Sequence, residues 1–225
     1  GFVVLGGAAA GAGWLALEPG AAVWGARPQD LSGDFTTELA FRLAARPALR
    51  RAAADSPSAL QLVFQSGEAV EARGSALSAP ATLARFLAVE VLLAPAPAVQ
   101  VLERAEGGEA RVLGRAALPA DFFTTASQQP RLLAVARRGE MLHVVLSPAP
   151  GTPAQPLLSA RMEWVGLCAA EGSCNAGVVY FAGGEAPALE LAEWTLLPAG
   201  QPATETAWAT LRPLYTPGFP LDIVL

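Results

Sequence analysis

The side chains that could perform chemistry are few and far apart in the chain. There is one histidine, His143, so any serine or cysteine nucleophile activated by an imidazole would have to use it. It stands inside the apolar run Met141–Leu146, and no Gly-x-Ser-x-Gly turn occurs that could present a serine to it. We therefore interpret His143 as structural and expect no catalytic residue, no cofactor and no enzyme activity.

Residues that could bind a metal ion are equally sparse. One histidine and two cysteines at these spacings do not make a site of several His or Cys ligands. Asp30 and Asp34 could offer calcium two carboxylates, but a solvated turn accounts for them better. The sequence predicts no metal site.

The two cysteines suggest an oxidising compartment. Cys168 and Cys174 are separated by five residues, a spacing that suits a disulfide across a loop and differs from the redox motif Cys-x-x-Cys. We predict a Cys168–Cys174 disulfide and a place outside the cytoplasm.

The composition indicates a folded protein with many short strands. Of 225 residues, 52% are hydrophobic and 16% charged, which excludes extensive disorder, while 22 glycines and 19 prolines interrupt the chain often. All fifteen basic residues are arginine, a bias that indicates a bacterial genome rich in G and C. The formal charge of −5 and the lack of a basic stripe argue against nucleic acid as a partner.

The first residues resemble a membrane anchor. The segment 2–17 carries no charge, Glu18-Pro19-Gly20 would end a helix, and arginine is not enriched after it. We predict a transmembrane helix over 1–19 and a linker over 20–33, with the main domain in the periplasm and the anchor in the bacterial inner membrane and its lipid bilayer. The h-region of a signal peptide stays open as an alternative, whereas a buried strand-turn-helix is rejected because its glycine spacing is wrong. Small residues would let this helix pack against other transmembrane subunits, and they are Gly6, Gly7, Ala10, Gly11 and Gly13.

From Thr36 onward the apolar residues alternate with period two, which is typical of strands. The turns at 106–109 and 137–140 join apolar runs and predict hairpins, and the run 86–93 predicts a strand buried on both faces. About ten or eleven strands predict an all-β, two-sheet sandwich or jelly roll over 34–198. A short helix is expected near 47–54, and 199–225 is expected to be an extended, proline-rich tail.

Three segments resemble the strands of concanavalin-A-like, laminin-G-type domains. They are Gly33–Leu43 (GDFTTELAFRL), Arg131–Gly139 (RLLAVARRG) and Leu189–Leu197 (LELAEWTLL). The resemblance covers residues 32–198 and implies a two-sheet jelly roll, without implying that the chain binds sugar.

Many glycosidases of this family carry a glu-x-asp-x-x-glu strand. Here Glu190-Leu191-Ala192-Glu193 lacks the middle aspartate, and strict alternation would place its two glutamates on opposite faces of the sheet. This argues against hydrolysis of glycosides.

These features lead to one functional hypothesis and two alternatives. We expect a non-catalytic, membrane-anchored periplasmic subunit of a respiratory, photosynthetic or secretion complex. A membrane-tethered lectin-like module that binds a glycan is the first alternative, and a glycoside hydrolase of the same fold is the second. Trp164 and Trp194 are expected in the core, and the expected contacts with a partner are Trp24, Trp208, Tyr215 and Phe219.

Overall fold

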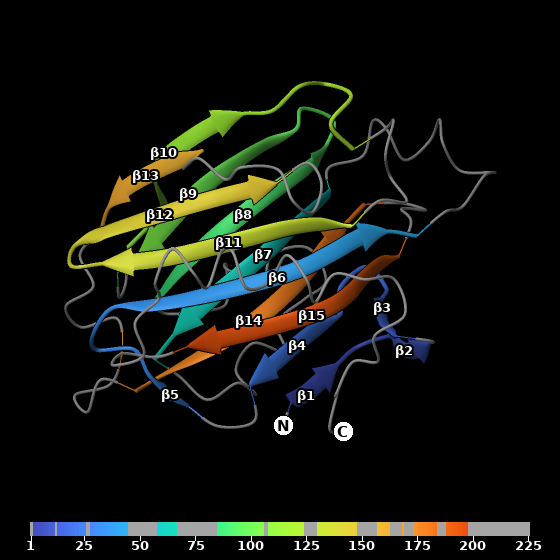
Figure 1. The fold of residues 1–225 in the computed structure, drawn as a ribbon, viewed down its shortest axis with the longest axis horizontal. Helices are drawn as coiled ribbons and strands as arrows, with labels where there is room; N and C mark the ends of the chain where they lie inside the picture. Colours follow the sequence, from blue (N-terminus) through green and yellow to red (C-terminus); the bar gives the residue numbers. More distant parts are fainter. Residues whose placement is uncertain are drawn as a thin grey trace.

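Two antiparallel sheets face each other and form a β-sandwich (Figure 1). The computed structural model describes residues 2–11, 13–25, 28–44, 58–66, 85–105, 108–123, 130–147, 157–162, 168, 173–183 and 188–197. Within these ranges the strands are β1 (Phe2–Leu5), β2 (Ala8–Gly11), β3 (Trp14–Leu17), β4 (Ala22–Gly25), β5 (Gln29–Asp30), β6 (Phe35–Leu43), β7 (Ser58–Gln65), β8 (Phe86–Ala94), β9 (Ala98–Arg104), β10 (Arg111–Ala117), β11 (Arg131–Arg138), β12 (Met141–Ser147), β13 (Leu158–Arg161), β14 (Ser173–Ala182) and β15 (Leu189–Leu197).

The order of the strands mixes hairpins with pairs that are distant in sequence. One sheet has eight strands in the order β1-β4-β14-β7-β8-β9-β10, with β5 paired to β14, and the other has seven in the order β13-β12-β11-β6-β15-β3-β2. The predicted hairpins are present as β9–β10 and β11–β12, whereas β6 pairs with the last described strand, β15, which is far from it in sequence. The two-sheet jelly roll predicted from the sequence is confirmed.

Alternate side chains of the two sheets fill the space between them. Leu39 and Phe41 of β6 are fully buried there, on the face that the alternation predicts. Strand β8 is buried on both sides, as its apolar run predicts, because Leu87 and Val89 point into this core while Ala88 belongs to a second apolar cluster on the outer side of the sheet.

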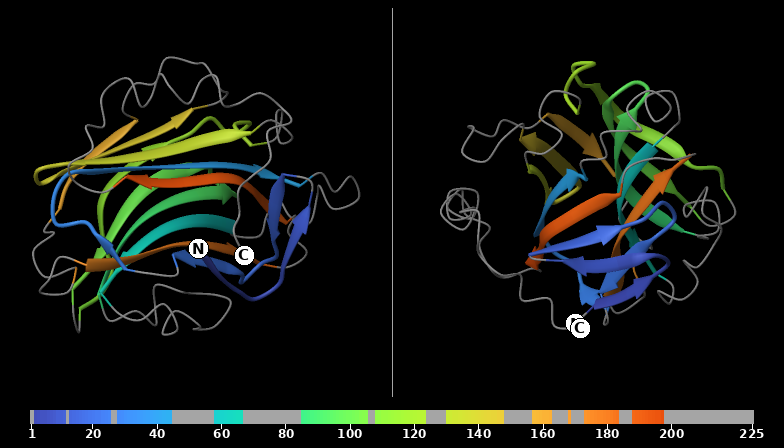
Figure 2. Two further views of the ribbon diagram at one scale, coloured as in Figure 1. Left: turned by 60° about the horizontal axis from the view of Figure 1, so that its bottom comes forward. Right: turned by 90° about the vertical axis from the view of Figure 1, so that its right-hand side faces the viewer.

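The eight-stranded sheet arches, and the concave side of the arch faces away from the other sheet (Figure 2, left). We call this outer side the concave face. Cross-strand pairing and the alternation of buried core residues place a shared set of side chains on it. They include Trp24, Asp30, Gln61, Val63, Gln65, Phe86, Ala88, Glu90, Leu92, Gln100, Leu102, Arg104, Val112, Arg115, Asn175 and Val179, and Gly177 lies among them without a side chain.

A transmembrane helix was expected over 1–19, whereas the described residues of this segment form β1, β2 and β3. The backbone of Gly6, Gly13 and Gly20 has positive φ values of 85°, 78° and 85°, which turns the chain after each short strand. Leu15 and Leu17 are buried in the core, so the apolar character of the segment serves the sandwich. Among the described residues, no helix has the length and hydrophobicity needed to span a bilayer.

The residues expected on the packing face of that helix therefore do not share a helical face. Gly6 and Gly7 lie between β1 and β2, Ala10 and Gly11 belong to β2, and Gly13 precedes β3. The expected linker over 20–33 contains β4 and β5, which pair with β14 in the eight-stranded sheet.

Several expectations fall outside the described residues. They are the short helix near 47–54, the tail 199–225, and Trp164, Trp208, Tyr215 and Phe219. Trp194 packs against the core between the sheets, and its Nε1 donates to Oγ1 of Thr37 at 3.0 Å. The predicted disulfide joins Cys168 to Cys174.

Trp24, which was expected at a contact with a partner, is fully buried on the concave face. Its cross-strand neighbour is Gly177 on β14, and a Cβ at that position would lie 2.4 Å from two carbons of the indole. The absence of a side chain at Gly177 therefore lets the indole lie directly on the sheet.

We expect Gly177→Ala to destabilise the protein. The added methyl group would force the indole off the sheet, and overpacking of this kind lowers the free energy of unfolding by about 1–3 kcal/mol. Chemical denaturation measures this change. In the control Gly108→Ala, the new Cβ comes no closer than 3.4 Å to another atom, and we expect a change within about 0.5 kcal/mol. Equal stability of the two variants would contradict this account of Gly177.

Candidate functional site

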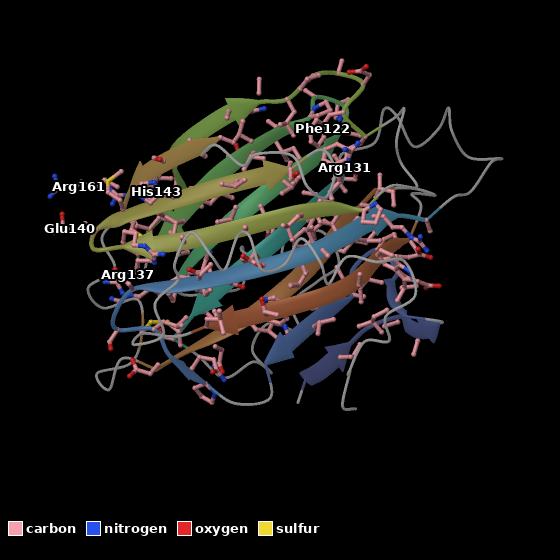
Figure 3. The ribbon with its side chains drawn as sticks, viewed as in Figure 1. Phe122, Arg131, Arg137, Glu140, His143 and Arg161 are labelled. Atoms are coloured by element: carbon pink, nitrogen blue, oxygen red, sulfur yellow. A yellow bond between two sulfur atoms is a disulfide. The ribbon has the colours of Figure 1, made fainter. Side chains whose placement is uncertain are left out.

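His143 lies on the outer side of the seven-stranded sheet. Its Nδ1 is 2.8 Å from Oγ of Ser159, which is exposed on the neighbouring strand β13. Figure 3 shows His143 near Glu140 and Arg161, which form an exposed ion pair of 2.7 Å at the same end of the sandwich. In the part of the chain that the structure describes, no carboxylate accepts a hydrogen bond from His143, so the third member of a catalytic triad is missing there.

Asp30 and Asp34 hold turns together instead of converging on a common point. Asp30 Oδ1 accepts hydrogen bonds from the hydroxyl and the backbone N–H of Ser32 at 2.7 and 3.0 Å, and these bonds lower the pKa of Asp30. Asp34 Oδ1 accepts from the N–H of Gly139 at 2.8 Å. The cation beside these turns is Arg137, whose Nη1 donates to the carbonyls of residues 31, 32 and 33 at 2.7, 3.0 and 3.1 Å.

Glu190 is held by an ion pair. Its Oε2 lies 2.5 Å from Nε of Arg42, and the guanidinium carbon of Arg42 lies 3.9 Å from the centroid of the Trp14 ring. A β-bulge between Leu191 and Glu193 shifts the register, so position 190 pairs with Arg42 and position 193 with Ala40. The two positions therefore fall on the same side of the sheet, and the expectation of opposite faces is wrong because the bulge inserts one residue.

A row of polar side chains crosses the concave face. Gln61 on β7, Glu90 on β8, Gln100 on β9 and Arg115 on β10 are direct cross-strand partners in turn. Nε2 of Gln61 donates to Oε1 of Glu90 at 2.6 Å, and Nε2 of Gln100 donates to Oε2 of the same carboxylate. Both oxygens of Glu90 are thus satisfied by side-chain amides, which is how a sheet can tolerate a charge that is 9% exposed.

The same face contains polar atoms that have no hydrogen-bond partner. They are Nε1 of Trp24, Oε1 of Gln61 and Nε2 of Gln65, all buried. Leaving such a group without a partner costs about 1–3 kcal/mol, so natural proteins usually satisfy it with a water molecule or a ligand. The buried part of the concave face therefore contains donor and acceptor groups whose hydrogen bonds are not formed by neighbouring side chains.

The row changes from buried to exposed along its length. Gln61 is 3% exposed, Glu90 and Gln100 are each 9% exposed, and Arg115 on the edge strand β10 is exposed. Val112, which also lies on β10, is 55% exposed and is the one large hydrophobic residue of the described chain with such exposure. A ligand would therefore meet the row at β9 and β10.

Sequence reasoning missed this row. Glu90 is the one polar residue of β8, and its hydrogen-bond partners are 29 and 10 positions away in the chain. A lone glutamate inside the run 86–93 was the available signal, because a charge in a strand buried on both faces needs partners.

We expect Glu90→Gln to destabilise the protein, because one of the two amide donors would then face another NH2 group. Loss of such a hydrogen bond at a buried site lowers the free energy of unfolding by about 1–3 kcal/mol, which urea denaturation can measure. In the control Glu140→Gln, the exposed ion pair with Arg161 is lost, and we expect a change within about 0.5 kcal/mol. A larger effect at Glu140 than at Glu90 would refute this interpretation of the row.

The chain is similar to several solved lectin structures, although no family model and no curated protein matches it. The metal-free lumenal domain of VIP36 aligns with a TM-score of 0.65 at 12% identity, covering 88% of this chain and 85% of that domain. The Ca2+/Man3GlcNAc-bound form of that domain gives 0.64 at 13% identity, covering 92% and 86%. The metal-free lectin I-B4 from Griffonia simplicifolia gives 0.62 at 15% identity, covering 87% and 92%.

These similarities correct the functional hypothesis. The hypothesis of an accessory subunit of a membrane complex is wrong. The segment expected to be its anchor helix forms strands, and the similar structures are lectins. Other transmembrane subunits as partners lose their support for the same reason. At these identities the likeness shows the fold, and the chain has the legume-lectin-like, concanavalin-A-like jelly roll to which three of its segments had pointed.

Proposed function

We propose that the chain is a non-catalytic, lectin-like module that binds carbohydrate on its concave face. The polar row carries the proposal, since it presents amide, carboxylate and guanidinium groups from four adjacent strands in one line. A sugar hydroxyl can both donate and accept a hydrogen bond, and an amide side chain can also do both. Similar structures support it, because one of them, VIP36, has been solved with Man3GlcNAc bound.

The accessible end of the row supplies the contact with the sugar. Arg115 is exposed and lies beside Gln100, whose amide is already oriented by Glu90. Val112 and Leu102, which pair across β10 and β9, add an apolar surface next to these polar groups. A pyranose ring combines an apolar face with a rim of hydroxyl groups, and this arrangement of side chains suits both.

We expect the protein to bind a subset of immobilised glycans and Arg115→Gln to weaken that binding by about tenfold or more. The reason is that a charge-assisted hydrogen bond contributes about 1.5–3 kcal/mol. A glycan array identifies the ligand, and titration calorimetry with that ligand measures the change in affinity.

The control for this prediction is Arg161→Gln. Arg161 is also an exposed arginine on a strand at the edge of its sheet, but it belongs to the seven-stranded sheet and pairs with Glu140. We expect its replacement to leave the affinity within about twofold. An array without hits would refute the proposed function, and equal losses in the two variants would remove the concave face as the site.

We further propose that the chain works in an oxidising compartment outside the cytoplasm, because disulfides persist there. The closed loop is short, and Cys174 is fully buried in the core between the sheets.

We expect reduction of the Cys168–Cys174 bond to lower the free energy of unfolding by about 2–3 kcal/mol, from the loop entropy regained by the unfolded chain. Denaturation with and without dithiothreitol measures the difference, and the Cys168→Ala/Cys174→Ala variant serves as the control that should not respond to the reductant. An equal response of both proteins to dithiothreitol would contradict a stabilising disulfide.

A further inference from the structure

Calcium is bound in several of the similar structures, which are Ca2+-bound forms of VIP36. A calcium site in a protein is built from about six to eight oxygen ligands, several of them from carboxylates. The described side chains of the concave face do not supply such a set of oxygen ligands. They offer too few free carboxylates, and a positive charge lies beside them.

The polar row has one carboxylate, Glu90, and both of its oxygens already accept hydrogen bonds from amides. The residues two positions away on the same strand, which share its side of the sheet, are Ala88 and Leu92. Neither can coordinate a cation. Across all described residues, no three His, Cys, Asp or Glu side chains come close enough to hold a metal ion.

The charge of the row also opposes a cation. Arg115 pairs directly with Gln100 on the same side of the sheet, so a fixed positive charge stands at the open end of the row. One carboxylate and one guanidinium leave the row without net negative charge. A divalent ion would have to displace two amide donors and approach this guanidinium, and a single carboxylate does not compensate for both.

We infer that the polar row of the concave face, as the described residues form it, binds its glycan without a divalent cation. The inference rests on the proposed function. The amide groups of Gln61 and Gln100 orient the carboxylate of Glu90, and the guanidinium of Arg115 provides the positive charge that faces the ligand. The polar contacts to the sugar thus come from side chains alone.

Thermal unfolding of the protein without glycan tests the cation directly. We expect the same Tm in excess EDTA and in millimolar calcium chloride, within about 1 °C, because the described residues form no cation site that could stabilise the folded state. A cation present at about one hundred times its Kd would raise the Tm by roughly 5 °C or more. A rise of that size overturns the inference, and the lumenal domain of VIP36 serves as the positive control.

A second measurement uses the glycan identified on the array. We expect its Kd in EDTA and in calcium to agree within about twofold, and a loss of about tenfold or more in EDTA would overturn the inference. If no glycan binds in either buffer, the proposed function fails, whereas the Tm comparison still decides whether the chain holds a cation. The two failures are therefore distinguishable.

Discussion

A carboxylate can be buried on the face of a sheet only if neighbouring strands supply donors to both of its oxygens. Glu90 meets this condition through register, because Gln61 and Gln100 are its direct partners on β7 and β9. A slip of either strand by one residue would turn its glutamine into the core and leave an oxygen of Glu90 without a donor. The polarity of the concave face and the register of three strands therefore depend on each other.

Strands and turns that depend on short-range sequence patterns could be predicted from the sequence. Strand β6 places Leu39 and Phe41 on one side, and the turn at 137–140 joins two apolar runs, so alternation and turn residues were sufficient to identify them. The N-terminal strands were missed because each has four residues, too few to show a period. Alanine and glycine give little contrast between buried and exposed positions, so β1 to β3 were taken together for one apolar helix.

The polar row could not be predicted, because its members meet only through the order of the strands. Gln61 and Glu90 are separated by 29 positions, and no motif links their spacing to a shared face. The bulge near Leu191 shows the same limit on a smaller scale. Alternation alone puts positions 190 and 193 on opposite sides, and one extra residue reverses that result.

The two sides of the eight-stranded sheet are under different constraints, which is consistent with a fold that is shared at 12–15% identity. Residues such as Leu87 and Val89 must fit the opposing sheet, which limits their volume and polarity. Residues on the concave face need only satisfy their neighbours across the strands. The polar side chains there can change without disturbing the core, provided that each buried polar group keeps its hydrogen-bond partners, as Glu90 does. The fold therefore fixes the positions of the outer face, and the cross-strand row fixes the chemical groups that stand at those positions.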